Sequence, residues 1–418
     1  MDFFRFLMSD VLSEPAVLVG LIALIGLIAQ KKPVTECIKG TVKTIMGFVI
    51  LGAGAGLVFS SLCDFANIFQ HAFGIQGVVP NNEAIVSVAQ KSFGKEMAMI
   101  MFFAMVINIM IARFTPWKFI FLTGHHTLFM SMMVAVILAT AGMTGVTLIA
   151  VGSLVVGVAM VFFPAIAHPY MKKVTGSDDV AIGHFSTLSY VLAGFIGSKF
   201  GNKEHSTEDM NVPKSLLFLR DTPVAISFTM SIIFLVTCLF AGADAVKELS
   251  GGKNWFMFSI MQSITFAAGV YIILQGVRMV IAEIVPAFKG ISDKLVPNAR
   301  PALDCPVVFP YAPNAVLVGF LSSFAAGLIG MFTLYLLNMI VIIPGVVPHF
   351  FVGAAAGVFG NATGGRRGAI LGAFAQGLLI TFLPVFLLPV LGDIGFANTT
   401  FSDADFGALG ILLGIIVR

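Results

Sequence analysis

The sequence predicts an all-α polytopic membrane protein with about eleven transmembrane helices. Three observations support this fold class. Hydrophobic residues make up 58% of the 418 residues, charged residues only 11%, and apolar runs of helical length follow one another along the chain. This is more apolar surface than a soluble globule covers. The net charge of +3 does not indicate a nucleic-acid partner, and the four cysteines show no metal-ligand or disulfide-rich spacing.

The apolar runs justify the expected helices one by one. A bilayer core about 30 Å thick requires roughly 20 apolar residues per spanning helix. Runs that meet or approach this length lie near residues 15–30, 44–62, 97–113, 119–140, 145–165, 221–242, 255–277, 314–336 and 367–391. Two further stretches, 340–360 and 406–417, bring the expected number to about eleven. The first run lacks a small-residue cleavage site, which favours a retained helix over a signal peptide.

Basic residues between the runs predict the orientation. Loops rich in Lys and Arg stay in the cytoplasm. Such residues follow the first, third and fifth runs: Lys31, Lys32, Lys39, Lys43, Arg113, Lys118, Lys172 and Lys173. We therefore expect the N-terminus outside and the C-terminus inside. Residues 174–200 are apolar but have a lysine at each end, which predicts a re-entrant hairpin that starts and ends on the cytoplasmic side.

The chain is expected to form one transmembrane unit, 1–418, built from two related halves. The halves are 1–200 and 222–395, with a polar cytoplasmic linker at 201–221 and an extra C-terminal helix at 396–418. Lys39-Gly40 precedes Pro80–Glu83 in the first half, and Lys289-Gly290 precedes Asp304 and Ala312–Asn314 in the second. With an odd number of spans per half, the second copy is inverted, and such repeats place a solute site near the bilayer midplane.

A few ionisable residues interrupt the apolar sequence. They are Glu83, His125, His126, His184 and Asp304. Ionisable side chains at membrane depth cost several kcal/mol unless they face a cavity or a partner, so each is a candidate for a solute path. This contrast indicates a transporter.

Asn82 and Glu83 lie in a mostly polar stretch, and a polar loop outside the membrane is an equal alternative on local sequence. The proposed repeat favours a site instead. The matching stretch around Asp304 is broken by prolines at 306, 310 and 313, and broken helices commonly build transporter sites.

Adjacent histidines on a helix point about 100° apart, so we expect one of His125 and His126 to be structural. A zinc site needs imidazoles three or four residues apart with a further ligand, which this pair does not offer, and no metal is expected. A neutral imidazole instead suits a polyhydroxylated solute, because it offers one hydrogen-bond donor and one acceptor.

His184 and Asp304 each have a structural alternative. His184, beside a glycine in the expected hairpin, is either satisfied by carbonyls of the turn or faces a solute. Asp304 either pairs with Arg300 or helix N-terminal amides, or accepts hydrogen bonds and a proton from substrate hydroxyls. Other polar residues in apolar surroundings are expected to join helices: Asn108, Gln262, Gln275, Asn338, His349 and Gln376.

At these residues the chain resembles the ascorbate-type enzyme IIC, the membrane component of the bacterial phosphoenolpyruvate-dependent phosphotransferase system. The resemblance covers nearly the full length. Its motifs are Ile38–Ile45, Leu122–His125, Ile182–His184, Gln275–Met279, Leu303–Cys305 and Phe309–Ala315. It implies a homodimer in the bacterial inner membrane, with a scaffold domain and a mobile core that carries the solute as an elevator.

The resemblance also implies a set of substrate contacts. They fall at Asn82, Glu83, His125, His126, Thr127, Leu128, Phe129, His184, Phe185 and Asp304. The family's ascorbate transporters carry Tyr where this chain has Glu83, and Gln-containing stretches where it has 126–129 and Phe185. Because ascorbate is an anion, Glu83 would repel it unless protonated or paired. We therefore expect ascorbate or a different sugar or polyol as solute.

The expected mechanism needs partner proteins and no cofactor. The chain shows no phosphorylatable cysteine in a soluble Gly-rich loop, so the phosphoryl donors are expected on separate IIA and IIB proteins, the latter carrying a phosphocysteine. Asp304 or His184 would orient the solute hydroxyl or remove its proton. The rival hypothesis is a proton-coupled secondary transporter with Glu83 or Asp304 as proton carrier. An intramembrane enzyme is not favoured, because the sequence shows no Ser/His or metal-ligand arrangement with usable spacing.

Overall fold

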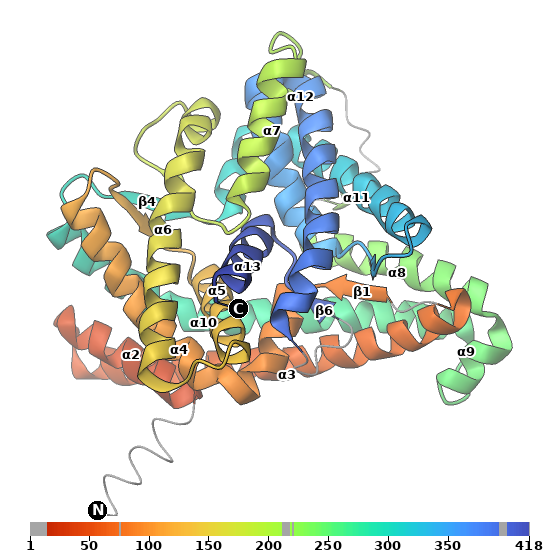
Figure 1. Cartoon of the computed structure of the whole chain (residues 1–418), viewed down its shortest axis with the longest axis horizontal. Coiled ribbons are helices and arrows are strands. Elements are labelled where there is room, and N and C mark those ends of the chain that lie inside the picture. The colour runs from red at the N-terminus through yellow and green to blue at the C-terminus, as the bar shows by residue number, and fades with distance from the viewer. Residues whose placement is uncertain (1–14, 75–76, 211–217, 220, 393–398, 418) are drawn as a thin grey trace, which may run out of the picture.

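The computed structural model is largely helical (Figure 1). It describes residues 15–74, 77–210, 218–219, 221–392 and 399–417. The α-helices are α2 (Pro15–Ala29), α3 (Val34–Phe73), α4 (Asn82–Phe114), α5 (Gly124–Thr140), α6 (Gly145–Thr175), α7 (Thr187–Phe200), α8 (Thr222–Ala241), α9 (Ala243–Leu249), α10 (Trp255–Leu295), α11 (Pro313–Leu336), α12 (Val346–Leu391) and α13 (Ala404–Val417). Two short 3-10 helices are η2 (Thr207–Asp209) and η4 (Cys305–Tyr311).

Two small parallel sheets, which the all-α expectation did not include, lie among the helices. Their strands are β1 (Gly77–Pro80), β2 (Phe119–Phe121), β3 (Ala181–Ile182), β4 (Arg300–Leu303), β5 (Val341–Ile342) and β6 (Thr399–Thr400). The strand orders are β5-β1-β6 and β2-β4-β3. Each central strand pairs in parallel with two strands from distant parts of the chain. These strands tie together backbone groups that interrupt the helices, as a membrane interior requires.

Each strand is followed directly by a helix. In the first sheet, β1, β5 and β6 lead into α4, α12 and α13, and in the second, β2, β3 and β4 lead into α5, α7 and η4. Because parallel strands end at the same edge of a sheet, three helices begin at each edge. The first residues of helices from both halves of the chain are thereby brought together.

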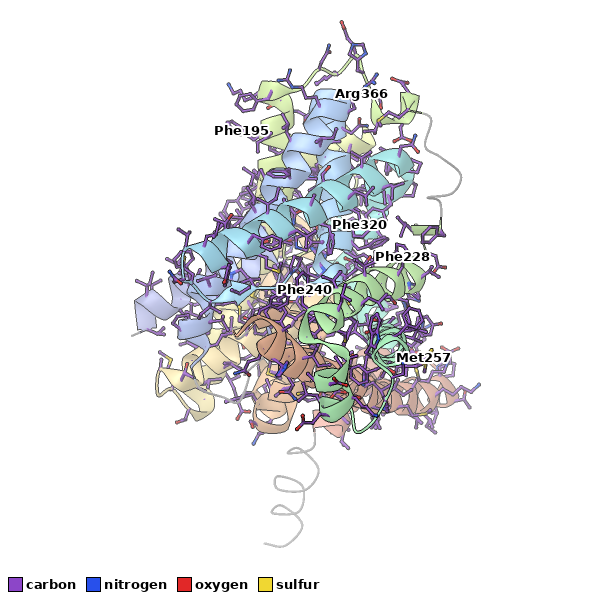
Figure 2. The ribbon with its side chains drawn as sticks, turned by 90° about the vertical axis from the view of Figure 1, so that its right-hand side faces the viewer. Phe195, Phe228, Phe240, Met257, Phe320 and Arg366 are labelled. Carbon is purple, nitrogen blue, oxygen red and sulfur yellow. The ribbon has the colours of Figure 1, made fainter. Side chains whose placement is uncertain are left out.

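The helices pack in two groups. Helix α3 packs along α10, with α2 and α8 against the same pair, and these helices run lengthwise in Figure 1. The other group contains α4, α5 and α6 on one side and α7, α11 and α12 on the other, with α6, α7 and α12 standing across the first group. The side view in Figure 2 has large apolar side chains on the outside, and Phe195, Phe228, Phe240 and Met257 are all exposed. An apolar outer surface is what a lipid-embedded protein presents.

Seven helices of the described residues are long and apolar enough to cross a membrane, and α5 and α13 are shorter apolar helices. The expected stretch 340–360 contains β5 and the first part of α12, and the stretch 367–391 forms the last part of α12, whose backbone leaves helical geometry at Gly364 and Gly365. At Gly364 a Cβ atom would lie 2.1 Å from the carbonyl oxygen of Gly197, so α7 and α12 approach too closely for a side chain. The expected hairpin 174–200 contains β3 and α7, and residues 211–217 and 220 of the expected linker lie outside the described residues.

Candidate solute cavity

A polar cavity of about 210 Å³ lies where the helices that follow the strands begin. Its lining residues come from both halves of the chain: Asn82, Glu83, His125, His126, Phe129, His184, Arg278, Asp304, Cys305, Pro306, Val347, Pro348, Phe351, Val352, Ser402 and Asp403. All five ionisable residues that the sequence singled out, Glu83, His125, His126, His184 and Asp304, are therefore brought together.

Asp304 lies between two histidines. Its Oδ2 is 3.4 Å from Nε2 of His125 and its Oδ1 is 3.8 Å from Nε2 of His184. The same Oδ1 accepts a hydrogen bond of 2.7 Å from the backbone N–H of Cys305, so Asp304 caps η4. Arg300, the expected ion-pair alternative, instead binds Asp178 at 2.6 Å. The carboxylate of Asp304 is thus oriented by the chain and still faces the cavity.

His184 is oriented by a tyrosine rather than by turn carbonyls. Its Nδ1 lies 2.9 Å from the hydroxyl of the fully buried Tyr190, and only 4% of the residue is exposed. This contact leaves Nε2 directed at Asp304 and the cavity. A carboxylate flanked by oriented imidazoles provides acceptors and donors for solute hydroxyl groups.

His125 and His126 both line the cavity, although they were expected to diverge. Nδ1 of His126 accepts a hydrogen bond of 3.2 Å from the backbone N–H of Phe185, and the ring stacks on Phe406. An accepting Nδ1 carries no proton, so neutral His126 holds its proton on Nε2. His126 therefore supports the backbone after β3 and also offers a donor to the cavity.

Asn82 binds Ser402 and Asp403, two residues that were not predicted from the sequence. Its amide nitrogen donates to Asp403 Oδ2 at 2.6 Å, and its amide oxygen accepts from the backbone N–H of Ser402 at 2.9 Å. Glu83 lies in the first turn of α4, is 6% exposed, and lines the cavity. The alternative of an external polar loop at these residues is therefore wrong, because the preceding Asn81 caps a buried helix there.

Ser402 and Asp403 lie more than 300 positions from Asn82, so no local spacing links them. The available signal was an acidic residue beside an apolar run, the same signal that identified Glu83. Asp405, two residues on, has a different role. Its carboxylate accepts from the backbone N–H groups of Thr187 and Leu188 at 2.8 and 2.9 Å, which caps α7.

Three residues named through the family resemblance are not among the described lining residues: Thr127, Leu128 and Phe185. All three are buried behind the cavity. Phe185 stacks on Phe121 with ring centroids 4.6 Å apart and reaches the site through its backbone N–H to His126. The side chain of Phe129 does line the cavity. Direct solute contact by Thr127, Leu128 and Phe185 stays a prediction.

The histidines and acids also form three groups with metal-ligand spacing: His125/His126/Asp304, His126/His184/Asp403 and His184/Asp304/Cys305. These groups arise between elements, so the spacing of His125 and His126 along one helix could not predict them. Two of the three use His126, whose Nδ1 is occupied by Phe185 and whose Nε2 then carries the proton. A protonated ring nitrogen is no metal ligand. The position of this proton therefore argues against an ion in the two groups that use His126.

Several of the other polar residues in apolar surroundings form hydrogen bonds between helices and strands, as expected. Asn108 bonds the backbone of β2, Gln262 bonds Asp64 of α3 at 2.6 Å, and His349 bonds Ser323 of α11 at 2.7 Å. Such contacts satisfy buried polar groups between helices.

A multi-pass membrane protein whose broken helices enclose a polar cavity has the architecture of a solute permease. The family model EIIC-GAT, described as "PTS system sugar-specific permease component", matches residues 10–405, and the chain belongs to this family. The chain is also 27% identical to the "Ascorbate-specific PTS system EIIC component" of Mycoplasma pneumoniae (strain ATCC 29342 / M129 / Subtype 1), over 96% of this chain and 67% of that protein. These findings confirm the resemblance and make the chain a sugar permease of the ascorbate and galactitol type.

Proposed function

We propose that this permease takes up L-ascorbate or a related sugar or polyol and releases it as a phosphate ester in the cytoplasm. The observation that carries this proposal is the carboxylate of Asp304, held between His125 and His184 in a cavity of about 210 Å³. The cavity offers acceptors and donors on several sides, which suits a small solute with many hydroxyl groups.

The phosphoryl donor is a phosphocysteine on a separate IIB protein, supplied in turn by a IIA protein. Asp304 accepts the hydrogen bond of the reacting hydroxyl and takes its proton, while His184, held by Tyr190, fixes the position of Asp304 and the solute. Phosphorylation adds negative charge beside Glu83, Asp304 and Asp403, so the product binds more weakly than the solute and leaves.

The sheets support the proposal of an inverted repeat. In the first sheet the middle strand β1 belongs to the first half and its neighbour β5 to the second, while its other neighbour β6 belongs to the C-terminal segment 396–418. In the other sheet the middle strand β4 belongs to the second half and its neighbours β2 and β3 to the first. Two copies of one unit that exchange strands in opposite orientation would produce this reciprocity.

The two packed helix groups support an elevator in a homodimer of the bacterial inner membrane. In this proposal α2, α3, α8 and α10 form the scaffold, and the group with α7, α11, α12 and the cavity lining forms the moving core. The N-terminus lies outside and the C-terminus inside. A solute cavity between the two groups changes its access when one group moves against the other.

Proteoliposome uptake tests the function. The permease is reconstituted alone or with phosphorylated IIB inside, and radiolabelled L-ascorbate, D-xylose and galactitol are supplied outside. We expect accumulation as phosphate ester only with phosphorylated IIB. A proton gradient that alone drives accumulation of free solute would contradict the phosphotransferase mechanism and favour proton-coupled transport.

A further inference from the structure

A second cavity, about 420 Å³ in volume, lies beside the solute cavity and is called the vestibule below. The two cavities share three lining residues: Arg278, Pro306 and Phe351. The other vestibule residues are Asp221, Pro223, Ile226, Ala267, Val270, Tyr271, Gln275, Phe309, Val316 and Phe350. Arg278 therefore borders both cavities.

The vestibule begins at the end of the linker 201–221. Asp221 caps α8 through a hydrogen bond from the backbone N–H of Val224 to its carboxylate, and it lines the vestibule. In the proposed topology this linker is cytoplasmic, so the vestibule is the side from which a IIB protein approaches. The donor phosphocysteine then meets Arg278 before it meets Asp304.

The negative charge of the donor phosphoryl group is repelled by the carboxylates that line the two cavities. A phosphoryl group carries about −1.5 to −2 charges at pH 7. Among the described lining residues, the solute cavity contributes the carboxyl groups of Glu83, Asp304 and Asp403, and the vestibule adds Asp221. Arg278 is the one Arg or Lys among these lining residues. Its guanidinium is therefore the group that offsets repulsion between the acids and the donor.

Arg278 is also close to the reacting atoms of the proposed mechanism. It lines the solute cavity together with His125 and Asp304, and Nε2 of His125 lies 3.4 Å from Asp304 Oδ2. Arg278 is exposed, and it lines both the solute cavity and the vestibule. The guanidinium thus borders the cavity from the vestibule side.

We propose that Arg278 is a catalytic residue that binds the phosphoryl group as it passes from IIB to the solute. The solute hydroxyl oxygen forms a bond to phosphorus, the phosphorus–sulfur bond of the phosphocysteine breaks, the thiolate leaves, and the hydroxyl proton goes to Asp304. Arg278 donates two parallel hydrogen bonds to the phosphoryl oxygens, which a guanidinium does better than an ammonium group. This inference rests on the proposed phosphotransferase function.

The test separates solute binding from phosphoryl transfer in the variants Arg278→Gln and Arg278→Lys. Solute affinity of the purified permease is measured with whichever of L-ascorbate, D-xylose and galactitol most raises the wild-type Tm. Single-turnover transfer is measured with radiolabelled phospho-IIB at saturating solute. Lys294→Gln is the matched control, because it removes one exposed positive charge from the same helix and lines neither cavity.

We expect Arg278→Gln to bind solute within about twofold of wild type and to transfer the phosphoryl group about 100-fold more slowly. Arg278→Lys should recover part of the rate, and Lys294→Gln should match wild type. Normal transfer by Arg278→Gln, or a loss of solute affinity as large as the loss of rate, would overturn the role of Arg278. Failure of the wild type itself to support phosphoryl transfer from phospho-IIB to the solute would instead overturn the proposed function, and the inference with it.

Discussion

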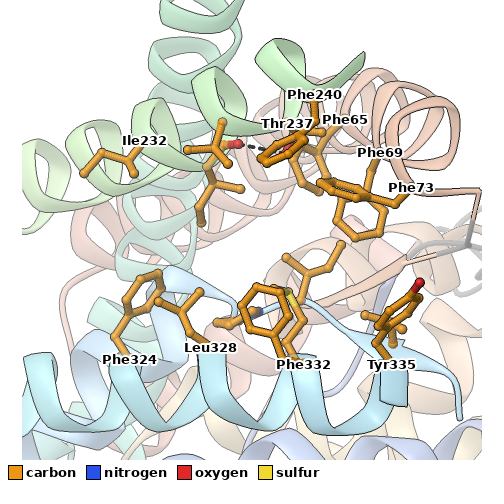
Figure 3. Close-up of a pocket in the computed structure, with 16 residues that line it drawn as sticks. Phe65, Phe69, Phe73, Ile232, Thr237, Phe240, Phe324, Leu328, Phe332 and Tyr335 are labelled. Carbon is orange, nitrogen blue, oxygen red and sulfur yellow. Dashed lines mark hydrogen bonds between the residues drawn. The ribbon is translucent and has the colours of Figure 1, made fainter. Parts of the chain in front are cut away.

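Two cavities of this permease differ in the chemistry of their lining residues: one is apolar, and the other contains acids and histidines. The larger, about 420 Å³, lies between α3 and α8 on one side and α11 and β5 on the other, and its lining is almost entirely aromatic and aliphatic (Figure 3). The hydroxyl group of Thr237, which lines this cavity, donates a hydrogen bond to the carbonyl oxygen of Ile233 in the same helix. The solute cavity has half this volume, and six of its lining residues are histidines or acids: Glu83, His125, His126, His184, Asp304 and Asp403.

The difference shows why volume alone does not identify a site. Apolar walls inside a membrane cost little, because lipid is as apolar as the side chains. Buried acids and imidazoles are costly unless they find partners, and here Asn82, Tyr190 and the N-terminal amides of η4 and α7 supply them. We therefore propose the polar cavity as the solute site, and residues of the apolar cavity serve as controls below.

The largest effect is expected from Asp304→Asn. This change keeps the shape but removes the charge between His125 and His184, and charged hydrogen bonds contribute about 1.5–3 kcal/mol each. We expect solute affinity to fall at least 100-fold by calorimetry or thermal shift, with a smaller loss for His184→Ala. Thr237→Val in the apolar cavity is the control and should bind normally. If Asp304→Asn and His184→Ala both bind as wild type, the site assignment fails.

A selectivity change of about tenfold, or about 1.4 kcal/mol, is expected from Asp403→Asn. Asn82 can still donate to the amide oxygen at this position, so the segment stays held while one cavity charge disappears. The affinity ratio of anionic L-ascorbate to neutral galactitol should rise, because repulsion of the anion falls. Ser402→Ala keeps the charge and should leave the ratio unchanged. An unchanged ratio in Asp403→Asn would remove this acid from the specificity argument.

Filling the apolar cavity should raise stability without affecting function. Leu328 points into this cavity, and Leu328→Phe adds apolar volume there (Figure 3). Cavity filling commonly contributes about 0.5–2 kcal/mol, so thermal unfolding should show a small increase in Tm. Solute affinity should stay within about twofold. A large loss of affinity would mean that the two cavities are coupled.

The smallest effect concerns an ion cluster outside both cavities. The hydrogen bond from His168 holds the pKa of Asp178 well below its usual range, with help from Lys172 and Arg300. A lowered folded pKa stabilises the fold above the unfolded value of about 3.9, and this contribution is lost as pH falls below it. The Tm difference between wild type and Asp178→Asn should shrink as the pH falls below about pH 4. Because the Asp178 side chain is 45% exposed, salt should reduce this difference. A difference that grows on acidification would contradict the sign of this argument.

The sequence predicted the apolar helices and the polar residues that interrupt them, because both signals are local. Glu83, His125, His184 and Asp304 were recognised by their cost in lipid, and the structure brings them into one cavity. The strands β1 to β6 were missed because they are two to four residues long and pair with distant segments. Asp403 carries the same local signal as Glu83, an acidic residue beside an apolar run, but its link to Asn82 is remote in sequence and has no local signature.

The element boundaries also depended on distant contacts. The third expected span, 97–113, begins at Asn82 in the structure, because β1 and the Ser402 segment bury the polar first turn of α4. In α12 the chain continues through Gly364 and Gly365, whose backbone angles are not helical. Helix α7 packs too closely there for a side chain at Gly364. Neither contact has a local signature in the sequence.

The most direct test of the central claim is a structure of the permease with bound solute, using the member of the L-ascorbate, D-xylose and galactitol panel that most raises the Tm. The account predicts solute density in the polar cavity, with a hydroxyl group within hydrogen-bond distance of Asp304 and the apolar cavity free of solute. Solute density in the apolar cavity, or at a site that Asp304 does not contact, would contradict it.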